Sequence, residues 1–296
     1  MTAVKSATAQ AKLRVEMARA RYGWLDVGIS TFKRFSDGDG GFYAAGLTYY
    51  AFFSVFPLVL FAVSALGFLT FLSQEWKQKI LDAGVESFPL ISGILTANNL
   101  NKIEDARFSL AGVGLLLVLY SGTGAIVAFE HALNRIYGVR EEGTFLQKRI
   151  SSLKFLGTFG GIILASVGLG AVAAVVESPA VSVLAYLTGF GASVLLFASA
   201  FKLLPRIHLS WRDVLPGAMI AAAIFEVLKI VGPLYLGAGA EGRNETFGAF
   251  AAAAGLLVSA YLLCQVALLA AQLNAVLAER RRSREFSLAD KDKEAP

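Results

Sequence analysis

The chain has 296 residues, of which 56% are hydrophobic, and its mean hydropathy is +0.60. Several apolar runs of about 18 residues or more exclude an ordinary soluble domain and predict an integral membrane protein. With one cysteine and two histidines, the sequence does not favour a zinc site, and we expect no metal site, no cofactor and no catalytic residues.

Residues 1–39 are predicted to form a cytoplasmic amphipathic segment ahead of the membrane domain. Tyr22, Leu25, Ile29 and Phe32 recur at intervals of three or four residues among basic positions, which is typical of a helix with one apolar face. Two interpretations fit this pattern: a helix lying along the membrane surface, and a cytosolic helix packed beneath the bundle. The glycine- and aspartate-rich stretch that follows is predicted to end the helix in a turn.

The first predicted span, residues 42–72, contains no charged residue and is long enough to cross a bilayer. Its first half carries polar side chains that include Tyr50 and Ser54, whereas its second half is almost purely apolar. Pro57 deprives the carbonyl four residues before it of a helical N–H donor. We therefore expect a kinked helix whose polar first half packs against protein and whose second half lies nearer lipid.

Further apolar runs predict five more spans and a polytopic, all-α membrane domain over residues 40–278. The loop after the first span has helical patterning of its own and is predicted to form two short amphipathic helices on the periplasmic side. The charged tail, residues 279–296, is expected to be disordered. The five further spans are predicted at residues 109–133, 153–176, 181–204, 213–236 and 247–277.

The distribution of Lys and Arg predicts how the six spans are oriented. The N-terminal segment, the tail and the loops on their side carry 21 of these residues, whereas the loops on the opposite side carry 5. Because cytoplasmic loops are enriched in Lys and Arg, both termini are predicted to be cytoplasmic. The net charge of +5 is thereby explained by membrane topology, and we expect no nucleic-acid partner.

Four local stretches, in this order along the chain, resemble the YihY/BrkB family of bacterial inner-membrane proteins, some of which are labelled ribonuclease BN. They are AGLTYYAFFSVFP at residues 45–57, ALNRIYGV at 132–139, LPRIHLSWRDVLPGA at 204–218, and TFGAFAA with QLNAVL between 246 and 277. One departure is Phe247, where the family often has tyrosine. The resemblance implies a six-span helical protein of the bacterial inner membrane and implies little about activity.

Two charged residues, Glu226 and Lys229, lie within the fifth predicted span. Each costs about 2.5–3.5 kcal/mol at the bilayer centre, so exposure of either to lipid is unfavourable. Their spacing of three residues places them on one helix face, where they can pair. The functional interpretation is a polar site or proton-coupled carboxylate facing a cavity. The structural interpretation is an ion pair at a contact between helices or subunits.

Gln265 lies at a comparable depth in the sixth predicted span, where it would bind a solute or join helices together. Tyr50, Ser54 and Pro57 mark a similar polar stripe on the first span. We hypothesise that these residues and the charged pair at Glu226 line one polar cavity.

Three residues are candidates for contacts with lipid headgroups at the cytoplasmic interface. Arg135 would bind lipid phosphate, or it would cap the end of its own helix and extend its charge towards water. Trp211 and Arg212 are predicted to anchor the start of the fifth span, and Asp213 is predicted to cap that helix.

Intramembrane charge, a polar first span interrupted by proline and small-residue helix faces favour a permease, or another transporter of lipids or small solutes. The alternative is a non-catalytic envelope scaffold whose polar residues serve packing and contacts within a homo-oligomer. A ribonuclease is least favoured, because neither soluble end contains clustered His, Asp and Glu residues. We therefore expect no enzymatic activity, and we expect membrane lipids and an unidentified lipid or small solute as partners.

Overall fold

The computed structural model describes residues 21–68, 107–139, 143–175, 179–237 and 248–294, and within these ranges every regular element is an α-helix. This confirms the predicted all-α class. The predicted periplasmic helices of residues 73–108 and the first twenty residues lie outside the described part of the chain.

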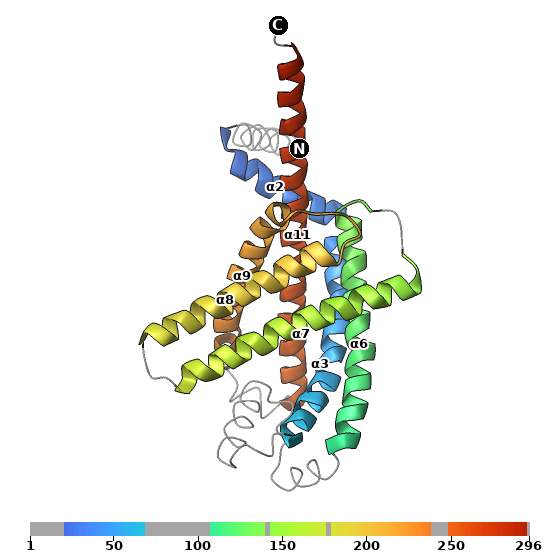
Figure 1. Cartoon of the computed structure of the whole chain (residues 1–296), viewed down its shortest axis with the longest axis vertical. Helices are drawn as coiled ribbons and strands as arrows, with labels where there is room; N and C mark the ends of the chain where they lie inside the picture. The colour runs from blue at the N-terminus through green and yellow to red at the C-terminus, as the bar shows by residue number, and fades with distance from the viewer. Residues whose placement is uncertain (1–20, 69–106, 140–142, 176–178, 238–247, 295–296) are drawn as a thin grey trace, which may run out of the picture.

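Six long helices coincide with the six predicted spans, and a shorter one, α2, precedes them (Figure 1). The largest difference from the predicted boundaries is at α11, which ends at Glu294 and not at residue 277. The next largest is at α7, which begins at Phe145 because Thr144 and Gln147 exchange side-chain-to-backbone hydrogen bonds as a capping box. The helices are α2 (Gly23–Asp37), α3 (Gly40–Phe68), α6 (Arg107–Ile136), α7 (Phe145–Val175), α8 (Pro179–Leu203), α9 (Trp211–Gly237) and α11 (Gly248–Glu294).

The charged tail was predicted to be disordered, and this prediction is wrong. Helix α11 continues unbroken to Glu294 and projects beyond the bundle (Figure 1). Its Glu, Arg, Ala and Lys residues are good helix formers. Two of its side chains also pair with α2: Glu279 lies 2.5 Å from Arg34, and Arg280 donates to the carboxylate of Asp26. The charged tail therefore forms ion pairs with residues about 250 positions earlier in the chain, which its composition alone did not indicate.

Helix α2 packs against α11, with Thr31 and Phe35 buried, which supports the interpretation of a helix packed beneath the bundle. Two large side chains of the same helix, Trp24 and Phe32, are largely exposed. Contact with a membrane surface through those two side chains stays a prediction.

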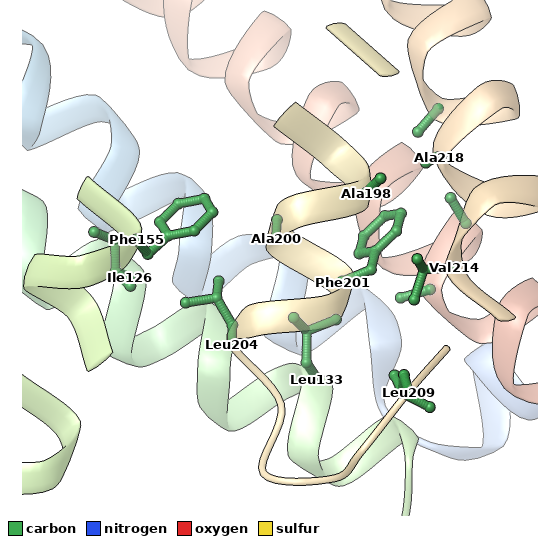
Figure 2. Close-up of a cluster of buried hydrophobic side chains, with 13 residues drawn as sticks. Ile126, Leu133, Phe155, Ala198, Ala200, Phe201, Leu204, Leu209, Val214 and Ala218 are labelled. Carbon is green, nitrogen blue, oxygen red and sulfur yellow. The ribbon is translucent and has the colours of Figure 1, made fainter. Parts of the chain in front are cut away.

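The described hydrophobic core lies at the end of the bundle next to α2. Figure 2 shows Phe201 of α8 beside Val214 of α9, while Leu204, just after α8, points towards Phe155 of α7. Helices α7 and α8 run side by side, and both lie obliquely to the long axes of α3, α6 and α11 (Figure 1). At this end of the bundle, the core packs α7 and α8 against α6, α9 and α11.

The outer surfaces of several helices are strongly apolar, for example at Leu184 and Leu187 of α8 and at Ile220 and Ile230 of α9. A soluble monomer rarely exposes contiguous apolar surface of this kind. Among the described residues, three segments are long and apolar enough to span a membrane: Tyr186–Leu203, Trp211–Val231 and Ala253–Ser283. These observations identify a helical membrane protein. That it has six membrane spans stays a prediction.

Candidate functional site

A cavity of about 390 Å³, here called the groove, lies between α3 and α6, with one residue of α7 in its wall. Its walls are mainly apolar and aromatic. The residues that line it are Phe42, Tyr43, Gly46, Leu47, Tyr50, Gly124, Val127, Ala128, His131 and Arg149.

The spacing of residues on both helices forms the groove. Phe42, Gly46 and Tyr50 lie four residues apart on α3 and therefore share a face. The ring of Tyr50 packs over Gly124 of α6, where an added Cβ would lie only 3.3 Å from the ring. A larger residue at Gly124 would therefore displace Tyr50 or narrow the groove.

Arg149 provides positive charge in the groove wall. It lies in the first turns of α7 and donates a hydrogen bond to the hydroxyl of Thr123 on α6. His131 also lines the groove, and its ring lies 6.0 Å from that of Tyr43, centre to centre. The groove can therefore accept an apolar body together with an anionic group.

The predicted residues of the first span lie on or near the groove. Tyr50 lines it, whereas Ser54, one turn further along α3, donates to the carbonyl of Ala51 at 2.8 Å. Helix α3 continues through Pro57. The side chains of Ala44 and Thr48 are buried against protein, whereas Tyr49 and Tyr50 are exposed, so only one face of the first half of α3 packs against protein.

The predicted Glu226–Lys229 ion pair is present on α9, with 2.7 Å between the carboxylate oxygen and the ammonium nitrogen. Ser193 of α8 donates a second hydrogen bond to Glu226, at 3.0 Å. Gln265 donates to the hydroxyl of Tyr261 within α11. None of these side chains lines either cavity described here, so a common cavity with Tyr50 stays a prediction.

A second cavity, of about 260 Å³, lies where α2, α3, α6 and α11 meet, and we call it the basic pocket. Arg135, predicted as a phosphate ligand, is one of its lining residues. The pocket is lined by Arg34, Phe35, Gly38, Gly40, Tyr43, Ala132, Arg135, Ile136, Leu268 and Gln272.

The other interface candidates lie at the start of α9. The ammonium of Lys202 lies 4.8 Å from the ring centre of Trp211, and the side chain of Arg212 is exposed. Asp213 accepts hydrogen bonds from the backbone N–H and the hydroxyl of Ser210, at 3.0 and 2.7 Å, which confirms the predicted cap. Membrane anchoring by Trp211 and Arg212 stays a prediction.

Sequence reasoning missed a buried ion pair between α6 and the segment that joins α8 to α9. Glu130 is only 1% exposed, and Arg206 donates to its carboxylate at 2.7 Å. The side chain of Asn134 accepts the backbone N–H of Arg206 at 2.8 Å. The sequence did offer one indication of this pair: Glu130 is an acidic residue inside the second predicted span, where a charge requires a partner.

Asn274 of α11, which is fully buried, joins α11 to α9 through the backbone. Its side chain accepts the N–H of Gly217 at 2.7 Å and donates to the carbonyl of Val214 at 3.0 Å. Asn134 and Asn274 thus connect three of the four stretches on which the family resemblance rested.

The sequence profile of one protein family, described as Virulence factor BrkB, matches residues 31–295. The chain belongs to the BrkB family. The match includes every residue that lines the groove and the basic pocket.

Relatives of this BrkB-family protein are named mainly as membrane proteins. YfkH of Bacillus subtilis, whose name describes it as ribonuclease-like, is 26% identical over 85% of this chain and 94% of its own. The inner membrane protein YhjD of Escherichia coli is 26% identical over 69% of this chain and 67% of its own. A UPF0761 membrane protein of Albidiferax ferrireducens is 25% identical over 86% of this chain and 63% of its own. No solved structure matches the chain.

Proposed function

We propose that this BrkB-family protein is a six-span permease of the bacterial inner membrane that moves amphiphilic anions, either lipids or small solutes, and that both its termini are cytoplasmic. The observation that carries the proposal is the groove between α3 and α6, which combines apolar walls with the guanidinium of Arg149.

The groove favours an amphiphile for two physical reasons. Burial of apolar surface contributes about 25 cal/mol per Å², so an alkyl or aromatic body gains free energy against Tyr50, Leu47 and Val127. An anionic group gains a charge-assisted partner in Arg149, which lies in a mainly apolar wall where a charge favours a counter-ion.

The proposed orientation is supported by the excess of Lys and Arg on one side of the predicted spans. The apolar outer surfaces of α8 and α9 are suited to lipid contact. Among the described residues that line the groove, none is a carboxylate. We therefore propose neither an enzymatic activity nor a nucleic-acid partner, and a ribonuclease remains the least favoured function.

The proposal is tested with purified protein in liposomes that contain a fluorescent phosphatidylglycerol, whose movement between leaflets is followed by dithionite quenching. We expect the wild-type protein to accelerate this movement and Arg149→Gln to abolish most of the acceleration. Lys154→Gln, an equal charge change at an exposed position of α7 outside the groove, is the matched control and should retain it. A wild-type rate equal to that of protein-free liposomes would refute lipid movement.

A homo-oligomeric scaffold is the second candidate, and the Glu226–Lys229 pair favours it. The two side chains are 31% and 47% exposed and lie beside the exposed Val227 and Ile230. An ion pair facing hydrocarbon is unfavourable, and a second copy of the chain would cover it. If so, Glu226→Leu combined with Lys229→Leu should change the number of copies per nanodisc, as measured by mass photometry.

A further inference from the structure

The basic pocket contains two arginines that converge from different helices. Arg34 of α2 lies 2.5 Å from Glu279 of α11, which occupies part of its hydrogen-bonding capacity. Arg135, at the end of α6, forms no ion pair or hydrogen bond through its side chain with any residue that the structure describes. Within the described part of the chain, the guanidinium of Arg135 thus has donors open to a ligand, and that of Arg34 has donors to spare.

Gln272 provides an independent sign of a ligand in the basic pocket. The residue is only 6% exposed and borders the cavity, yet its side-chain amide has no hydrogen-bond partner among the described residues. A side-chain amide that borders a cavity without a protein partner can bind a polar group placed in that cavity. An acceptor placed in the cavity would satisfy its NH₂ group.

The start of α3 adds a favourable field. Gly40, the first residue of this 29-residue helix, lines the pocket, and the N–H groups at a helix start attract anions. A side chain at Gly40 would collide with the ring of Phe35, which also lines the pocket, so this position requires glycine. Cationic, amide and backbone donors therefore surround one small space.

From this convergence we propose that the basic pocket is a binding site for a phosphate group, presented either by free inorganic phosphate or by an anionic lipid headgroup. Phosphate suits the pocket because a guanidinium binds two of its oxygens in parallel, as Arg135 and Arg34 can each do. Gln272 would bind a third oxygen. The inference does not depend on transport through the groove.

The test uses the full chain purified in detergent and follows two ligands separately. Isothermal titration calorimetry measures binding of inorganic phosphate, with chloride as the reference anion. Native mass spectrometry measures retention of phosphatidic acid, with phosphatidylcholine as the reference lipid. The variants are Arg135→Gln and Gln272→Met, and the matched control is Lys33→Gln, which removes an equal charge from an exposed position of α2 outside the pocket.

We expect saturable binding of at least one phosphate ligand, a roughly tenfold loss of affinity in Arg135→Gln, and little change in Lys33→Gln. Binding of both ligands, or of inorganic phosphate alone, assigns the site to the free anion or the bare phosphate group. Binding of phosphatidic acid alone assigns it to a lipid headgroup. Absence of binding to both ligands, or binding that neither pocket variant weakens, would overturn the proposal.

Discussion

The guanidinium of Arg281 donates a hydrogen bond of 2.8 Å to the backbone carbonyl of Arg212. That carbonyl lies four residues before Pro216, which has no N–H to offer it. Helix α9 therefore carries a proline one turn after its start, and α11 supplies the donor that the proline lacks. This contact joins the start of α9 to α11.

Replacement of Arg281 tests this relationship. Arg281→Ala is expected to lower the free energy of unfolding by about 1 kcal/mol, because a charged but partly exposed donor is lost from a carbonyl with no helical partner. Urea-induced unfolding in detergent, followed by circular dichroism, measures the change. Arg282→Ala, at an exposed neighbouring position, should leave the midpoint unchanged, and an equal loss in both variants would contradict the interpretation.

Gly217 is predicted to be intolerant of even one methyl group. Its Cβ would collide with the backbone carbonyl oxygen of Ala270 and with the side chain of Asn274, neither of which can easily move. We expect Gly217→Ala to destabilise the protein by about 1–3 kcal/mol through overpacking.

Gly189→Ala is the control for that experiment. This glycine lies inside α8 with nothing within 4 Å of an added Cβ. Alanine should be neutral or stabilising there by up to about 1 kcal/mol, because it is the better helix former. Thermal melts of the two variants in the same detergent should therefore shift in opposite directions or differ clearly. Equal melting temperatures would contradict the close approach of α9 and α11.

The buried pair of Glu130 and Arg206 should behave non-additively. Glu130→Gln and Arg206→Gln are each expected to cost about 3–5 kcal/mol, because each leaves a charge without its partner in a mainly buried site. The double variant should cost clearly less than the sum. A double-mutant cycle of unfolding free energies measures the coupling, and strict additivity would show that the pair contributes nothing.

The predicted orientation can be measured by cysteine labelling in a Cys264→Ala background, since Cys264 is the only cysteine. Ser36→Cys and Ser283→Cys should react with an impermeant maleimide only after the cells are permeabilised. Arg243→Cys, in the predicted periplasmic loop, should react in intact cells and serves as the positive control. Labelling of Ser283→Cys in intact cells would refute a cytoplasmic C-terminus.

Local patterns in the sequence predicted the features that depend on near neighbours. The apolar runs located the long helices, the three-residue spacing predicted the Glu226–Lys229 pair, and an acidic residue in the first turn predicted the Asp213 cap. Each follows from helix geometry, which relates residues three or four positions apart.

Features that join distant parts of the chain were not predicted. Arg206 and Glu130 are 76 residues apart, and Arg280 pairs with Asp26 across 254 residues. A single sequence does not reveal which helices are neighbours, so Glu130 had no visible partner and the charged tail had no visible contact. The basic pocket was missed for the same reason, since Arg34, Gly40, Arg135 and Gln272 come from four different helices.

Helix α11 is one continuous rod of 47 residues, about 70 Å long. Along this helix, Gln272 borders the basic pocket, Asn274 accepts a hydrogen bond from the backbone of α9, and Arg280 forms an ion pair with Asp26 of α2. Because an unbroken helix turns as a unit, a small rotation of α11 about its axis would alter all three contacts together. A change at any one of the three contacts would thereby be felt at the other two.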